Sequence, residues 1–97
     1  MNDLRFEWED QKSKTNAKKH GISFEEARTV FLDESARLIA DPDHSSEEDR
    51  FILLGLSIRL RVLAVSHCYR ESGNVIRIIS ARKATTMERN EYVRWSS

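Results

Sequence analysis

The sequence holds one cysteine, one proline and three glycines, and its apolar runs are short. A single cysteine, Cys68, excludes an internal disulfide and fits a reducing compartment such as the cytoplasm. No run approaches the roughly 20 apolar residues of a membrane span, and the first residues lack a signal-peptide pattern. We therefore expect a cytoplasmic protein with one small domain, residues 1–97, in which Cys68 is a buried strand residue rather than a reactive thiol.

Several motifs of known chemistry are also absent. The chain has no GxGxxG or GxxxxGK[ST] phosphate-binding motif, no HExxH, no paired-cysteine metal site and no nucleophile elbow. The acidic stretch at residues 41–49 carries His44 among carboxylates, without a partner at a fixed spacing, so it is better interpreted as a solvated loop than as a metal site. We expect no metal and no cofactor.

The net charge is zero, but the charge is unevenly distributed along the chain. Residues 1–49 contain seven Lys or Arg against thirteen Asp or Glu, whereas residues 50–97 contain nine against three, so the halves carry about −6 and +6. Solvated strand ends and helix faces are one explanation of this asymmetry. The other is that the C-terminal half presents a surface to a polyanion.

Three runs of β-branched and apolar residues lie between residues 50 and 86, separated by polar breaks at residues 57–60 and 70–74. They predict a three-stranded antiparallel meander. With four-residue loops, Arg50 faces His67, His67 faces Ile76, and Arg61 faces Arg82. Their side of the sheet would also carry Ile52, Leu54, Leu63, Val65, Ile76 and Ile78. The other, more open side would carry Gly55, Ala64, Ser66, Cys68, Arg77, Ala81 and Lys83. A one-residue slip in either loop would exchange the two sets.

Shorter elements surround the meander. Leu4, Phe6 and Trp8 alternate with charged residues, which predicts an edge strand. We expect helices at residues 10–20, which Gly21 ends, and from the capping box at residues 23–26 to residue 34, followed by a short strand at residues 36–40. A second capping box, Thr85 to Glu88, begins a C-terminal helix. The expected fold class is α+β: an antiparallel sheet with two N-terminal helices and one C-terminal helix.

Arginine and lysine side chains at a sheet rim are suited to metal-independent cleavage of RNA. The 2′-hydroxyl attacks the adjacent phosphate, a base removes its proton, and cations stabilise the added negative charge. Arginine does this well because its guanidinium fork matches two phosphate oxygens. His67 has the residue type for proton exchange near neutral pH, although a lone strand histidine is more often structural. Lys19 and His20 either cap the first helix or contact a bound anion.

Several segments together resemble the BrnT family of bacterial toxins, and the likeness runs through nearly the whole chain. They are Trp8, NAKKHGISFEEA (residues 16–27), DPDH (residues 41–44), EDRF (residues 48–51), Gly55 and RIISARKAT (residues 77–85). KHGISFEEA and RIISARKAT, in that order and at this chain length, form a specific pair of signatures.

The resemblance implies a RelE-like ribonuclease fold and the role of toxin in a type II toxin–antitoxin system. Such a toxin cleaves RNA, inhibits translation and arrests growth. It forms a hetero-oligomer with BrnA, a ribbon-helix-helix antitoxin. The toxin binds operator DNA only through this antitoxin. Arg82 is the first candidate for stabilising the phosphate. Further catalytic candidates are Lys83, Arg50 and His67, and candidates for RNA binding are Arg77, Arg61, Lys19 and His20. The alternatives are a non-catalytic nucleic-acid-binding module or co-repressor, and an interaction scaffold.

Overall fold

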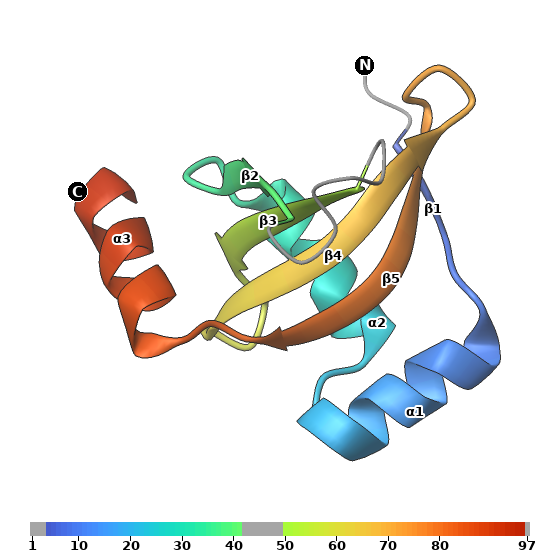
Figure 1. Ribbon diagram of the computed structural model, residues 1–97, viewed down its shortest axis with the longest axis horizontal. Coiled ribbons are helices and arrows are strands. Elements are labelled where there is room, and N and C mark those ends of the chain that lie inside the picture. The colour runs from blue at the N-terminus through green and yellow to red at the C-terminus, as the bar shows by residue number, and fades with distance from the viewer. Residues whose placement is uncertain (1–3, 42–49, 97) are drawn as a thin grey trace.

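The computed structural model describes residues 4–41 and 50–96. Its elements are β1 (Arg5–Glu7), α1 (Asp10–His20), α2 (Phe24–Ala27), the 3-10 helix η1 (Arg28–Leu32), β2 (Arg37–Ala40), β3 (Arg50–Leu56), β4 (Val62–Arg70), β5 (Val75–Lys83) and α3 (Thr86–Ser96), as Figure 1 shows. The predicted acidic loop with His44 lies, apart from Asp41, outside the described residues. Among the described helices, none is both long and apolar enough to cross a lipid bilayer.

The five strands form one sheet in the order β1-β5-β4-β3-β2. The pairs from β2 to β5 are antiparallel, which confirms the α+β fold with its C-terminal meander. β1 joins the edge of the sheet as predicted, but it runs parallel to β5. Parallel strands need a long connection, and here α1, α2 and the first strands of the meander lie between them in the chain.

Local signals in the sequence explain the helix ends. Gly21 adopts a left-handed conformation, with φ of 73°, and its N–H donates to the Ala17 carbonyl, which ends α1 where predicted. The Ser23 hydroxyl accepts the Glu26 N–H at 3.1 Å and begins α2. The predicted second helix is in fact two short helices, since α2 passes into η1 after one turn.

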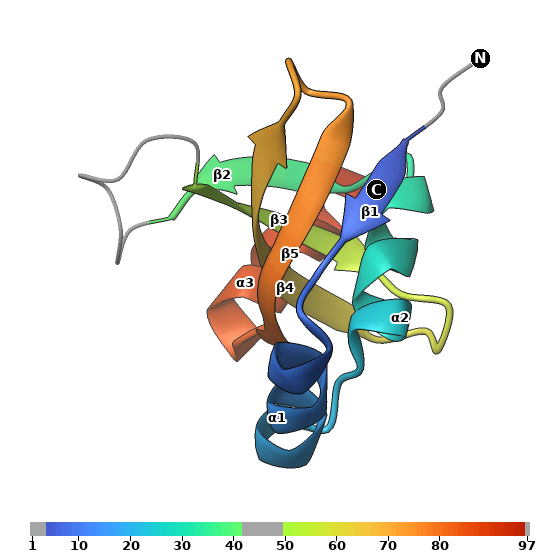
Figure 2. The same cartoon turned by 90° about the vertical axis from the view of Figure 1, so that its right-hand side faces the viewer.

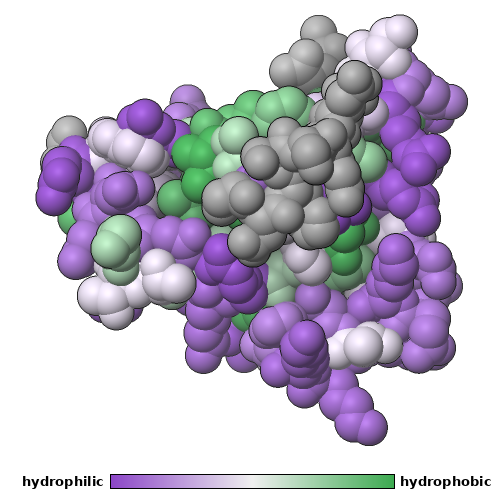
Figure 3. Space-filling model, viewed as in Figure 1, coloured by the Kyte–Doolittle hydropathy of each residue, from purple (hydrophilic) through white to green (hydrophobic). Residues whose placement is uncertain are grey.

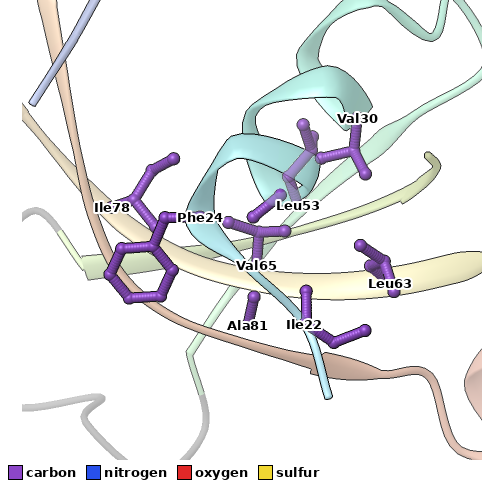
Figure 4. Packing of buried hydrophobic residues seen from close by; sticks show 9 residues of the cluster. Ile22, Phe24, Val30, Leu53, Leu63, Val65, Ile78 and Ala81 are labelled. Carbon is purple, nitrogen blue, oxygen red and sulfur yellow. The ribbon is translucent and has the colours of Figure 1, made fainter. Parts of the chain in front are cut away.

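The main core lies between the sheet and the α2–η1 segment (Figure 4). It consists of Ile22, Phe24, Ala27, Val30, Leu53, Leu63, Val65, Ile78 and Ala81. A smaller cluster of Ile52, Leu54 and Ala64 lies on the opposite side of the sheet. β3 is therefore buried on both sides, and this explains why its apolar residues form a continuous run instead of alternating with polar ones.

The predicted register is wrong in both hairpins. Leu56 pairs with Val62, so the first loop holds five residues, and Arg50 lies opposite Cys68 instead of His67. In the second hairpin Arg70 pairs with Val75, so the loop begins one residue later than predicted and His67 lies opposite Ile78 instead of Ile76. A β-bulge beside Ser66 and His67 then shifts the pairing of the residues beyond it by one.

Beyond the bulge Arg82 lies opposite Ala64, not Arg61. Each irregularity moves one arginine to the other side of the sheet. Arg50 and Arg82 therefore share a side with Arg77, whereas His67 points toward the main core.

A side chain, not a strand, covers part of the β5 edge. β1 pairs only with Val75–Arg77, and α1 lies beside the rest of β5 (Figure 2). Buried Asn16 on α1 accepts the Ala81 N–H through Oδ1 and donates through Nδ2 to the Ala81 carbonyl, at 3.1 and 2.9 Å. Its Nδ2 also donates to the Ile22 carbonyl. One amide thus satisfies backbone groups that a neighbouring strand would otherwise bind.

Candidate active site

Arg50, Arg77 and Arg82 lie on the side of the sheet that faces away from α2, and we call this side the arginine face. Arg50, Cys68 and Arg77 lie opposite one another on β3, β4 and β5, so the two arginine backbones are about 10 Å apart. Arg82 lies five residues further along β5, about 16 Å from Arg77. Figure 3 looks onto this face and shows hydrophilic side chains gathered near β5, β1 and α1.

Arg77 is positioned by a carboxylate on the neighbouring strand. Its Nη1 donates to Glu7 Oε2 at 2.8 Å, and Arg70 Nε lies 3.4 Å from the same oxygen. This end of the face therefore combines two arginines with one acid. Arg70 was missed as a candidate because it was read as part of a turn. Its spacing of two residues from Cys68 on one strand would have placed it on this face.

Arg82 is held where β5 meets α3. Its guanidinium donates to both carboxylate oxygens of Glu88, at 2.7 and 3.1 Å. Glu88 also accepts the Thr85 N–H, and the Thr85 hydroxyl accepts the Glu88 N–H, which confirms the predicted capping box. The hydrogen bonds from Arg82 are the main cause of a lowered pKa of Glu88, so this carboxylate is ionised at neutral pH.

Contacts near the C-terminus fix α3 against the sheet. The Tyr92 hydroxyl donates to Asp33 Oδ2, and that oxygen also accepts the Leu56 N–H of β3. Burial and the Asp33 carboxylate raise the pKa of Tyr92 to about 12. The Arg37 guanidinium stacks on the Trp95 ring, 3.0 Å from its centroid. α3 is thereby anchored to β2 and β3, and Arg82 is held by an anchored helix.

A shallow hollow of about 260 Å³ lies between α1 and β5, beside the arginine face. It is lined by Gln11, Lys12, Thr15, Asn16, Lys19, His20, Ile79 and Ser80. Lys19 and His20 therefore lie next to β5, on the strand that carries Arg77 and Arg82. Lys12 was missed from the sequence, although its spacing of seven residues from Lys19 puts both on one side of the helix.

The family model described as "Ribonuclease toxin, BrnT, of type II toxin-antitoxin system" matches residues 8–88. The chain belongs to the BrnT ribonuclease toxin family. It is also similar in structure to the ribonuclease toxin BrnT of Brucella abortus, with a TM-score of 0.66 and 24% sequence identity over 86% of this chain and 99% of that one. No curated protein matches the chain.

Family membership confirms the resemblance drawn from the two signatures. The chain is a ribonuclease toxin of a type II toxin–antitoxin system, and such a toxin has a cognate antitoxin. The matched residues include Arg50, Arg77 and Arg82, and they end at Glu88. The arginine face of this BrnT family member is therefore built almost wholly from the matched segment.

His67 lies on the opposite side of the sheet from these arginines, and its side chain is fully buried. Nδ1 lies 3.0 Å from the Val65 carbonyl oxygen and Nε2 lies 3.1 Å from the Tyr69 hydroxyl, while the Phe31 ring packs edge-on against the imidazole. Burial lowers the pKa of His67, which favours the neutral ring. The predicted grouping of His67 with Arg50 and Arg82 is wrong, and burial separates the ring from any RNA on the arginine face.

Arg61 and Lys83 also point away from the arginine face. Arg61 donates through Nη2 and Nε to the two oxygens of Glu26, at 2.6 and 2.8 Å, and to the Gly21 carbonyl. These hydrogen bonds are the main cause of a lowered pKa of Glu26. Lys83 is exposed and lies opposite Leu63, on the side of the main core. The structure thus brings together three of the four predicted strand arginines and leaves out Arg61.

Proposed function

We propose that this toxin cleaves RNA without a metal ion, in the cytoplasm, by attack of a ribose 2′-hydroxyl on the adjacent phosphate. The observation that supports this most directly is the arginine face, where Arg50, Arg77 and Arg82 point from one side of the sheet. Cationic forks at fixed positions stabilise the charge that develops on a pentavalent phosphate. Arg82 holds the scissile phosphate, and Arg50 and Arg77 bind the flanking backbone.

In the proposed reaction the 2′-oxygen forms a bond to phosphorus and the bond from phosphorus to the 5′-oxygen breaks. The 2′-proton passes to a base, and the leaving 5′-oxygen takes up a proton. Two carboxylates lie beside arginines of the face, Glu7 at Arg77 and Glu88 at Arg82, and either can accept the 2′-proton. The products carry a 2′,3′-cyclic phosphate and a 5′-hydroxyl. Lys19 and His20 lie where a strand of RNA would leave the face.

The proposed partner is a BrnA-like antitoxin with a ribbon-helix-helix domain, which neutralises the toxin and carries it to operator DNA. Cleavage of RNA by free toxin then inhibits translation and arrests growth. Because the antitoxin supplies all contacts to DNA in this proposal, the toxin alone should bind operator DNA no better than any other DNA.

Purified toxin incubated with single-stranded RNA in EDTA tests the proposal. We expect fragments that end in a 2′,3′-cyclic phosphate, detected by mass spectrometry. Fragments that form only after a divalent cation is restored would contradict metal independence. Intact RNA that still binds the toxin in a salt-sensitive manner would instead identify a binding module or co-repressor.

A further inference from the structure

An apolar groove beside β1 and the β3–β4 loop is not used by the proposed reaction. It has a volume of about 650 Å³ and is lined by Leu4, Phe6, Arg28, Phe31, Leu32 and Ile58. A smaller hollow shares Leu32 and Ile58 with it and continues toward Asp33. Figure 2 shows the elements concerned, β1, the helical segment after α2 and the β3–β4 loop, along one side of the molecule.

The groove exposes large aliphatic side chains to solvent. Leu32 is 81% exposed and Ile58 is 74% exposed, and Leu4 lies beside them at 43%. Below them Phe6 packs edge-on against Phe31, and Phe31 packs edge-on against buried His67. A contiguous apolar patch of this kind is typical of a surface that binds another protein.

The groove and the arginine face lie on opposite sides of the sheet. Phe31 contacts His67 on the side of the main core, whereas Arg50, Arg77 and Arg82 point to the other side. RNA phosphates gain nothing from leucine and isoleucine side chains. The chemistry of the groove therefore fits a protein partner and not the substrate.

The charges around the groove limit what that partner can be. Among the side chains that line the larger hollow, the one charged residue is Arg28, and exposed Arg59 follows Ile58 in the β3–β4 loop. Asp33, in the smaller hollow, is already bound to the Leu56 N–H and the Tyr92 hydroxyl. An apolar segment flanked by acidic residues complements this surface.

We propose that the groove is a docking site for the cognate antitoxin, which inserts an apolar, acidic segment of its chain over Leu32 and Ile58. The inference rests on the part of the proposed function in which an antitoxin silences the toxin, and not on the cleavage chemistry. Since the sheet separates the groove from the arginine face, the groove supplies affinity, and the remainder of the antitoxin reaches the face that binds RNA.

The test compares Leu32→Glu and Ile58→Glu with the matched control Leu60→Glu. Leu60 is as exposed as Leu32 and Ile58, at 79%, and belongs to the same loop as Ile58, but it is not among the side chains that line the groove. Each full-length variant is titrated calorimetrically with the purified cognate antitoxin, and circular dichroism checks its fold. We expect the two groove variants to bind at least tenfold more weakly, about 1.4 kcal/mol, and the control to bind like wild type.

Cleavage of RNA by the same proteins separates this inference from the proposed function. Both groove variants should cleave RNA at the wild-type rate when no antitoxin is present. Wild-type affinity for the antitoxin in both groove variants would overturn the inference, whatever the toxin does to RNA. Self-association of wild-type toxin that is lost in Leu32→Glu and that the antitoxin does not displace would also overturn it, because the groove would then bind a second copy.

Charge reversal at Arg28 sharpens the test. Arg28→Glu should weaken binding of the antitoxin. The difference in affinity from wild type should become smaller as the salt concentration is raised, because Arg28 is exposed and salt screens its charge. An affinity that rises in Arg28→Glu would show that the docking segment is basic, and it would overturn the assignment of an acidic partner.

Discussion

Two arginine–glutamate pairs of similar geometry lie on opposite sides of the same sheet. In each pair an arginine at or beside a strand end donates to both oxygens of a glutamate on a helix: Arg61 to Glu26, and Arg82 to Glu88. The Glu26 side chain is 5% exposed and that of Arg61 26%, whereas the values for Glu88 and Arg82 are 20% and 39%. The same two residue types thus occupy different environments.

The difference lies in what else each arginine pair binds. Glu26 also accepts the Ser57 hydroxyl, and Arg61 also donates to the Gly21 carbonyl, so that pair joins α2, the end of α1 and the β3–β4 loop. Glu88 belongs to the capping box of α3, and the Arg82 side chain is more exposed than that of Arg61. Burial makes the first arginine part of the scaffold. The proposed function requires the second arginine to exchange its carboxylate for a phosphate of RNA.

The largest expected effect is on activity. Arg82→Ala should lower RNA cleavage by about 10²–10³-fold, because the proposed reaction would lose the arginine assigned to stabilise transition-state charge. Thermal unfolding should change little, since the side chain contributes little to either core cluster. The measurement is the single-turnover rate of cleavage with folded protein.

Arg82→Lys is the matched control for that variant. It keeps the charge but loses the bidentate fork, so it should restore only part of the rate. A wild-type rate in folded Arg82→Ala would remove Arg82 from the proposed reaction.

The next effect is on stability. Glu26→Ala should lower the free energy of unfolding by about 2 kcal/mol, because it leaves Arg61 and Ser57 without their buried partner. Folded protein should cleave RNA at the wild-type rate. Denaturant titration measures the change in the free energy of unfolding. If folded Glu26→Ala were inactive, Arg61 would belong to the reaction after all and the contrast between the two pairs would fail.

The smallest effect is on the response to acid. The pKa of Glu26 and that of Glu88 are both lowered, chiefly by hydrogen bonds from Arg61 and from Arg82. A depressed folded-state pKa stabilises the protein above the unfolded value of 4.5, and the contribution is lost as pH falls through the folded pKa. Stability should therefore fall below about pH 4.5.

Glu26→Gln should remove more of this acid sensitivity than Glu88→Gln, because its carboxylate is the more buried one. Unfolding curves at several pH values measure the two slopes. If stability changed equally with pH in Glu26→Gln and Glu88→Gln, solvent would screen the two arginine–glutamate pairs to the same extent.

Local signals made the elements of this fold predictable, and long-range pairing did not follow from them. Gly21, the Ser23 N-cap and the Thr85–Glu88 capping box mark helix ends that the structure confirms. The sides of the meander were misassigned because residues 51–56 are apolar on both faces of β3 and gave no alternation to fix the register. A fifth loop residue and a bulge, neither visible in the residue pattern, then exchanged the faces of Arg50 and Arg82.

The candidate site shows the same limit. The family signature put Arg77 and Arg82 among the candidates, but the face that they share with Arg50 depends on those two irregularities. His67 was a candidate by residue type, and its burial depends on the Phe31 and Tyr69 rings that pack against it from η1 and from its own strand. Residue type can therefore suggest chemistry, but it does not tell which side chains meet.

The amide of Asn16 has a consequence for how this protein behaves at high concentration. Exposed strand edges invite another chain to extend the sheet, which leads to swapped dimers and aggregates. By occupying both backbone groups of Ala81, Asn16 blocks that extension at the point where β1 no longer covers β5. A single side chain thus closes this part of the β5 edge.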